Sequence, residues 1–219
     1  MKTILRSFLL FGALASAIAA IPAYAAPPTI IASAPFTITV PGKYVLHNNL
    51  TIPPGAVSAI TITCSDVIVD LNGYTIIGPG GGIKSNGITG YNTTGAIGAL
   101  SNIIIRNGTI TNCLLGITFF AGPPGYGATD SIIEYITLRA INATAISDDT
   151  GKGNHIKNCI IIPGPDIGAG IQLTNCTDDV ASGNRFYPLP VHLPAPYETI
   201  LLEGTVEGNV VVNNEDANP

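Results

Sequence analysis

The side chains best suited to chemistry in this chain stand at a repeated place, directly before a series of corner residues that are mostly asparagine. A cationic side chain at this place can bind the carboxylate of an acidic sugar, and a nearby histidine can act with it as a base. Four residues are therefore candidates for catalysis: Arg106, Glu134, His155 and Lys157. From the first unit of the series, two residues are expected to join this face and bind substrate, Asp70 and Asn72.

The same charged residues also admit a purely structural interpretation, as a ladder of opposite charges. Arg106, Glu134 and Lys157 alternate in sign along the series. Opposite charges that face each other on neighbouring strands stabilise a sheet by roughly a few tenths of a kcal/mol per pair. Both interpretations stay open at this point, and binding of an acidic glycan would distinguish them.

The corner residues recur along the chain with a nearly fixed period. They are Asn107, Tyr135, Asn158, Asn184 and Asn209, at steps of 28, 23, 26 and 25 residues. An earlier pair, Asn72-Gly73, looks like the tip of a two-residue hairpin. The later asparagines are followed by Gly, Cys, Arg or Val, and the bulky residues among these are poor at positive φ. The period therefore indicates stacked coils, in which one group forms a hydrogen-bonded ladder: Asn107, Asn158, Asn184 and Asn209.

Two repeat architectures have a period of this size. A leucine-rich repeat carries its own asparagine, but it also needs a helical or 3₁₀ segment in each unit. The stretches between the corners show little 3.6-residue periodicity, and Ile rather than Leu dominates them. We therefore predict an all-β fold, a single-stranded parallel β-helix of about five to six coils with an N-terminal cap.

Three segments carry a resemblance to a known family. PGKYVLHNNLTIPPG and ITITCSDVIVDLNGYTIIG lie within residues 41–78, and SNIIIRNGTITN follows them. Together they resemble the right-handed parallel β-helix proteins of the pectate-lyase-like superfamily, over residues 36–212. The resemblance implies a right-handed helix and an extracellular or periplasmic protein that handles acidic or neutral polysaccharide. Because one fold carries many functions, it does not by itself imply an activity.

The resemblance also raises two specific sites. Lyases of this kind bind Ca²⁺ through clustered carboxylates, and the adjacent Asp178 and Asp179 are the only candidates here for such a site. Otherwise no cofactor is expected, and these aspartates are expected to form Asx turns. Related polygalacturonase-like hydrolases use paired aspartates and a histidine from separate coils. In SDDTGKGNH, residues 147–155, these residue types fall within one turn, so we expect a loop there.

Composition and targeting signals limit the setting of the protein. Residues 1–25 have a basic start, an apolar run and an Ala-Tyr-Ala ending, as in a cleaved signal peptide, so we expect an exported protein, secreted or periplasmic. Removing Lys2 and Arg6 leaves seven basic side chains against fourteen acidic ones, a net charge of −7. This charge argues against nucleic acid as a partner, and no second apolar segment predicts a membrane span. The expected organisation is a cap with the first strands at 26–57, a β-helix at 58–212 and a polar tail at 213–219.

Loops and cysteines complete the list of candidates. Insertions at 79–99, 119–128 and 186–198 interrupt the period and carry aromatic residues that could stack on sugar rings. The aromatic candidates for substrate binding are Tyr126, Tyr187 and Tyr197. The four cysteines are Cys64, Cys113, Cys159 and Cys176, and their places in the coils are too far apart for disulfides, so free thiols are expected.

The sequence therefore predicts an exported β-helix protein that binds polysaccharide or serves a structural role at the cell surface or in the periplasm. No complete catalytic set can be assembled from it. One alternative is a small polysaccharide lyase or glycoside hydrolase that acts on acidic glycans. Another is an adhesin or assembly module that associates with itself, because the exposed end of the last coil requires a cover, either residues 197–203 or a partner chain.

Overall fold

The computed structural model describes residues 27–80, 84–91, 100–119, 127–188 and 198–216. Over these residues the protein is all-β, and no helix occurs in these ranges. No described segment therefore offers a helix long and apolar enough to cross a membrane. The predicted signal peptide, residues 1–25, lies outside the described residues.

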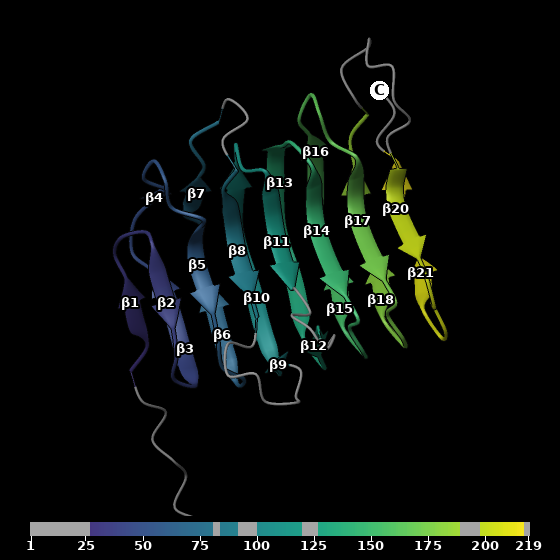
Figure 1. Ribbon diagram of the computed structural model, residues 1–219, viewed down its shortest axis with the longest axis horizontal. Coiled ribbons are helices and arrows are strands. Elements are labelled where there is room, and N and C mark those ends of the chain that lie inside the picture. The colour runs from purple at the N-terminus through teal and green to yellow at the C-terminus, as the bar shows by residue number, and fades with distance from the viewer. Residues whose placement is uncertain (1–26, 81–83, 92–99, 120–126, 189–197, 217–219) are drawn as a thin grey trace, which may run out of the picture.

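The strands stack in parallel and form a β-solenoid of about five turns. Figure 1 shows the coils side by side, from the purple first coil on the left to the yellow last coil on the right. Within the described residues, the strand pairs of these sheets are parallel and join segments of consecutive coils, such as Arg106 with Glu134. This confirms the predicted all-β parallel β-helix.

One wall of the solenoid is built from eight strands in the order of the chain. They are β1 (Thr29–Ile31), β3 (Gly42–Leu46), β6 (Val67–Asp70), β10 (Ile103–Thr111), β13 (Ile132–Ile141), β15 (His155–Lys157), β18 (Val180–Ser182) and β21 (Val210–Val212). β10 and β13 are long because they bend at a corner and continue into the adjoining wall. That adjoining wall also contains β4 (Leu50–Thr51), β7 (Thr75–Ile77), β16 (Ile160–Pro163), β19 (Arg185–Phe186) and β22 (Glu215–Asp216).

A separate sheet of seven strands closes each coil. Its strands are β2 (Phe36–Ile38), β5 (Ser58–Ile62), β8 (Asn86–Gly90), β11 (Leu115–Phe119), β14 (Thr144–Asp149), β17 (Ala169–Thr174) and β20 (Glu198–Glu203). Between this sheet and the first wall, β9 (Leu100–Ser101) pairs with β12 (Ala128–Thr129). Single bridges from Thr129 through Lys152 and Thr177 to Glu207 continue this short ladder.

The core follows from the period-two alternation of the strands. Ile105, Ile133 and Ile156 occupy one position in successive coils, and each is at most 3% exposed. Fully burying an aliphatic side chain of this size contributes about 1.5–3 kcal/mol to the free energy of unfolding. Phe119 and Phe186 also face inward at 2% exposure, so they fill the core rather than contact a ligand.

The corner after the first wall is formed by residues with positive φ. They are Asn107 (60°), Tyr135 (54°), Asn158 (53°), Gly183 (63°) and Asn213 (52°). The strand register places these five residues in one column. The prediction was therefore right for the first three corners and wrong for Asn184 and Asn209. Glycine and asparagine both tolerate the left-handed region, so the pattern of asparagines alone could not decide between neighbouring residues.

Strand pairing also extends beyond the predicted limits of the β-helix. β1 already pairs with β3 from Thr29 onward, within the segment 26–57 that was expected to contain the cap and the first strands. At the other end β22 pairs with β19 as far as Asp216, within the expected tail. β20 pairs with β17 as the last strand of the seven-stranded sheet, so residues 198–203 continue the stack instead of covering its end.

Candidate functional site

The charged candidates meet in a single outward-facing column. Asp70 pairs in register with Arg106, Arg106 with Glu134, and Glu134 with Lys157. They interact as two ion pairs: Arg106 Nε lies 3.1 Å from Asp70 Oδ2, and Lys157 Nζ lies 3.2 Å from Glu134 Oε2. Within the described ranges these are the only salt bridges. Because the cationic side chains are about one third exposed, solvent screens both pairs.

This arrangement changes what the face can do chemically. Each cation already has a carboxylate partner, so a sugar carboxylate would have to compete with Asp70 or Glu134 for it. His155 is exposed in the neighbouring outward column, in register with Ile132 and Val180. No hydrogen bond joins His155 to the charged column among the described residues.

The candidates for substrate binding are dispersed. Asn72 lies exposed at its corner with a φ of 51°, and its backbone N–H donates to Asp70 Oδ1 at 3.0 Å. Tyr187 is half-buried beneath the guanidinium of Arg185, whose Cζ lies 5.4 Å from the ring centroid. Tyr126 and Tyr197 lie outside the described residues. The structure thus brings Asp70 and Asn72 together and leaves Tyr187 on a different wall.

Tyr135 is the residue of this face that the sequence reasoning did not select. It holds the corner position between Asn107 and Asn158 with a φ of 54°, and its side chain is 56% exposed. A bulky residue in the left-handed region is a conformational outlier. The sequence did hold a signal, because a tyrosine interrupts an otherwise asparagine-rich series. We name the exposed line Asn107, Tyr135 and Asn158 the corner ridge.

The asparagine ladder exists, but it runs one residue after the corner. Asn184 Oδ1 accepts from the backbone N–H of Cys159 at 3.0 Å, and its Nδ2 donates to Ile156 O at 2.9 Å. Asn214 makes the same two contacts one coil later, with the N–H of Asn184 and with Ala181 O. Asn107 and Asn158 are exposed and lie outside this ladder.

A second ladder of the same kind runs beside the corner that leads into the first wall. Its members are Ser131, Asn154, Asp179 and Asn209. Each later member accepts a hydrogen bond from the backbone N–H of the member one coil earlier. Asn154 Oδ1 accepts from Ser131 at 2.9 Å, and Asp179 Oδ1 accepts from Asn154 at 2.7 Å. Asn209 Oδ1 accepts from Asp179 at 2.8 Å. Asn209 therefore has a structural role, although at a different corner from the one predicted.

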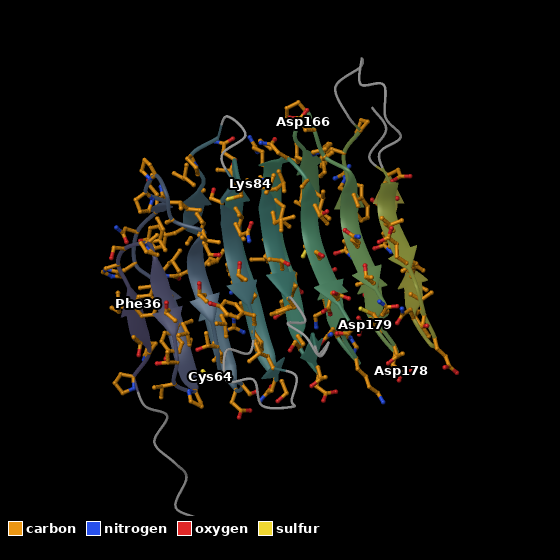
Figure 2. All side chains as sticks on the ribbon, in the orientation of Figure 1. Phe36, Cys64, Lys84, Asp166, Asp178 and Asp179 are labelled. Carbon is orange, nitrogen blue, oxygen red and sulfur yellow. The ribbon has the colours of Figure 1, made fainter. Side chains whose placement is uncertain are left out.

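The two aspartates considered for Ca²⁺ face opposite directions. Asp178 is exposed with a φ of 58°, whereas Asp179 is 1% exposed and faces the interior. Figure 2 shows both at the lower edge of the late coils. Their opposite exposure does not favour a shared Ca²⁺, whose ligand oxygens lie about 2.3–2.6 Å from the ion.

Asp179 instead belongs to a buried group with Asp148 and Cys176. Their potential ligand atoms all lie within 4.8 Å of one another. Burial raises the pKa of Asp148 well above its ordinary value, and the neighbouring Asp179 raises it further. Burial likewise raises the pKa of Asp179 and of the Cys176 thiol. Asp148 faces inward while His155 faces outward, so SDDTGKGNH does not assemble a hydrolase-like set.

All four thiols are free. Cys64 is half-buried, and Cys113, Cys159 and Cys176 are buried. Burial raises the pKa of Cys113 and of Cys159 to about 12, so these two thiols are protonated at neutral pH.

Comparison with known proteins gives no family and no curated relative. No model of a protein family matches the chain. No curated protein matches it. Among solved structures, the chain is similar to a proposed glycosyl hydrolase from Parabacteroides merdae ATCC 43184, with 13% identity and a TM-score of 0.45. The likeness covers 82% of this chain and 81% of that one.

Proposed function

We propose that the protein is exported and binds polysaccharide through the corner ridge and the charged column beside it. The observation that carries this proposal is Tyr135, a tyrosine that is 56% exposed in a left-handed corner. Holding a residue with a Cβ in this conformation costs about 1–2 kcal/mol. Asn107 and Asn158 occupy the same position in the flanking coils with residues that tolerate it better.

The chemistry around Tyr135 suits a sugar chain. An exposed aromatic ring offers an apolar face that a pyranose ring can stack on, with amide groups on both sides for its hydroxyls. The adjacent column adds the ion pairs of Arg106 with Asp70 and of Lys157 with Glu134. These groups can hydrogen-bond hydroxyls without leaving their partners, so neutral as well as acidic glycans fit. The resemblance to the pectate-lyase-like superfamily and the predicted signal peptide support the same class of ligand and setting.

The test compares glycan binding by two tyrosine variants of the mature chain, residues 26–219. Affinity electrophoresis in polygalacturonate, alginate and neutral glucans measures retardation of the folded protein. Tyr135→Asn should lower the glycan affinity obtained from the retardation by roughly 5- to 160-fold, because loss of a stacked aromatic ring costs roughly 1–3 kcal/mol in comparable sites. Tyr91→Asn removes another exposed tyrosine, on the seven-stranded side of the coil, and should leave retardation unchanged. Equal retardation of the wild type and Tyr135→Asn would contradict the proposal.

The charged column is tested separately with an acidic glycan. Replacing Arg106 and Lys157 together by alanine should abolish any preference for polygalacturonate over neutral glucan. An unchanged preference would leave the column as a structural ladder.

A catalytic role is tested in the same preparations. Incubation with each polysaccharide, with and without Ca²⁺, would release unsaturated products or reducing ends if the protein were a lyase or a hydrolase. Turnover that depends on Arg106 or Lys157 would replace binding by catalysis as the function. We expect none, because each of these cations is held by a carboxylate.

Self-association through the last coil is a second candidate function. Val211 pairs in register with the buried Ala181 and continues its inward-facing column. Val211 is nevertheless 43% exposed, and Val210 and Val212 beside it are similarly exposed. Exposed strand edges with apolar side chains favour pairing with another chain. Light scattering on a sizing column should then give a dimer that Val211→Lys converts to a monomer. A wild-type monomer at all concentrations would remove this candidate.

A further inference from the structure

The buried group of Asp148, Cys176 and Asp179 is named here the corner cluster. Asp148 is the last inward-facing residue of β14. Cys176 follows β17, and Asp179 directly precedes β18. Three segments of two successive coils therefore meet at one corner of the solenoid. Asp148 is 2% exposed, Asp179 1% and Cys176 0%. Neither the charged column nor the corner ridge includes any of these residues.

Two carboxylate oxygens of the cluster are buried without a partner. Neither Asp148 Oδ1 nor Asp179 Oδ2 has a hydrogen-bond partner among the described residues. Their other oxygens are bound: Asp148 Oδ2 accepts from Asn154 Nδ2 at 2.7 Å, and Asp179 Oδ1 accepts from the backbone N–H of Asn154 at 2.7 Å. Leaving a buried polar atom unpaired costs about 1–3 kcal/mol, and more for a charged one. Two such atoms in one place point to a group that would pair both.

Asp179 is also the irregular member of its ladder. Asn154 and Asn209 use their Nδ2 to donate to a backbone carbonyl, of Ala128 at 2.7 Å and of Cys176 at 3.0 Å. Asp179 has a carboxylate oxygen where these asparagines have a donor nitrogen. An asparagine would satisfy the ladder here as it does in the coils on either side. The carboxylate is therefore unexplained by the ladder alone.

The backbone leaves room for the carboxylate of Asp148. A Cβ at Gly151 would collide with Asp148 Oδ2, and one at Gly127 would lie 2.8 Å from Asp148 Oδ1. Only residues without a side chain fit at these two places. The glycines thus leave space for the Asp148 carboxylate, of which only Oδ2 has a hydrogen-bond partner among the described residues.

We propose that the corner cluster binds one divalent transition-metal ion, of the Zn²⁺ class, through one oxygen each of Asp148 and Asp179 and the thiolate of Cys176. A thiolate together with carboxylates suits Zn²⁺ or Co²⁺, whereas Ca²⁺ and Mg²⁺ require oxygen ligands. The ion would occupy the position that faces both unpaired oxygens. Asn154, which holds Asp148 Oδ2, is a positioning residue because it orients a ligand without contacting the ion.

A metal ion would link two coils of the solenoid at a corner that otherwise contains two unpaired acids. Without an ion, burial favours the protonated form of each of the three groups. With an ion, the three ligands are ionised and their charge is largely neutralised. The proposed role is structural and does not depend on glycan binding.

The test uses Co²⁺ as the probe, because a thiolate bound to Co²⁺ gives a charge-transfer absorption in the near ultraviolet. The mature chain is treated with a chelator, its circular dichroism is recorded, and it is titrated with Co²⁺. The expected result is saturation at one ion per chain, with the thiolate absorption and a raised midpoint of thermal unfolding. A folded protein that shows no such absorption overturns the proposal.

Two variants and a matched control place the ion at the cluster. Cys176→Ser should abolish the thiolate absorption. Asp179→Asn should weaken Co²⁺ binding by more than about 100-fold, the upper end of the effect of losing only a supporting residue. Asn at 179 completes the ladder, so this variant should fold, and its loss of binding cannot be assigned to unfolding. Cys159→Ser removes another buried thiol and should bind Co²⁺ as the wild type does. Unchanged binding and absorption in Cys176→Ser and Asp179→Asn would overturn the proposal.

Discussion

Glu134 and Asp148 lie on strands that follow each other in the chain, β13 and β14, but their surroundings differ completely. Glu134 faces solvent on the first wall and pairs with Lys157 at 3.2 Å. Asp148 faces the interior, has one oxygen on Asn154 and leaves the other without a described partner. A carboxylate on the outer surface can stay ionised at little cost, whereas a buried one must find a cation or keep its proton.

The comparison shows where polar residues affect the stability of a β-solenoid. On the outer face, charged pairs exchange contacts with water for contacts with each other, and the net gain is small. Inside the corner, a polar group that loses its hydrogen-bond partner cannot bind water instead, so the free energy of unfolding falls markedly. Mutations that remove a partner should therefore have large effects in the corner and small effects on the face.

The largest effect is expected for Asn154→Ala. This change removes the acceptor of the Ser131 N–H and the donor to Ala128 O and Asp148 Oδ2, three buried contacts at once. The free energy of unfolding should fall by about 3 kcal/mol. Urea unfolding followed by circular dichroism measures this loss. A loss below about 1 kcal/mol would mean that the corner is hydrated, which would remove the contrast with the outer face.

A smaller effect, dependent on pH, is expected for Asp148→Asn in chelator-treated protein. Because burial raises the pKa of Asp148, the folded state keeps a proton that the unfolded chain loses near pH 4. The contribution of Asp148 to the free energy of unfolding of the wild type should therefore decrease as pH rises from about 4 toward the folded pKa, by about 1.4 kcal/mol for each pH unit. Asp148→Asn should flatten this decline.

Urea titrations of both proteins at several pH values provide the measurement. Curves of the wild type and of Asp148→Asn that run parallel over this range would contradict the prediction, because Asp148 would then titrate alike in the folded and unfolded states.

A gain of stability is expected for Tyr135→Asn. The asparagine relieves the strain of a bulky residue in the left-handed region. Little buried surface is lost with the ring, since Tyr135 is mostly exposed. The midpoint of thermal unfolding should rise, corresponding to about 1 kcal/mol. The corresponding change at the next corner, Asn158→Tyr, should lower it by a similar amount. A loss in Tyr135→Asn would mean that the ring packs on the corner and stabilises it.

The smallest effect is expected in the charged column. Replacing Glu134 and Lys157 singly and together by alanine isolates their interaction by a double-mutant cycle. The coupling free energy should be about 0.5 kcal/mol and should shrink at high salt. A coupling above about 2 kcal/mol would contradict the view that the outer face contributes little.

Several features of the fold could be predicted from residue types and spacing. Alternation along the strands places Ile105, Ile133 and Ile156 inward and Arg106, Glu134 and Lys157 outward, because successive side chains of a strand face opposite sides. The repeated corner then required consecutive coils to lie in register, which brought the charged residues into one column. The prediction failed at Asn184 and Asn209, where a glycine or a later asparagine occupies the corner.

The sequence by itself therefore determined the stacking of the coils and the residues of the charged column, since both follow from a local period that any part of the chain displays. Only the tertiary structure decided the register of the later corners, because Asn, Asp and Gly all tolerate the left-handed region and a shift by one residue leaves the pattern intact. It also decided that Asp148, Cys176 and Asp179 meet. Their approach depends on how two coils turn the same corner, and no spacing along the chain encodes that geometry.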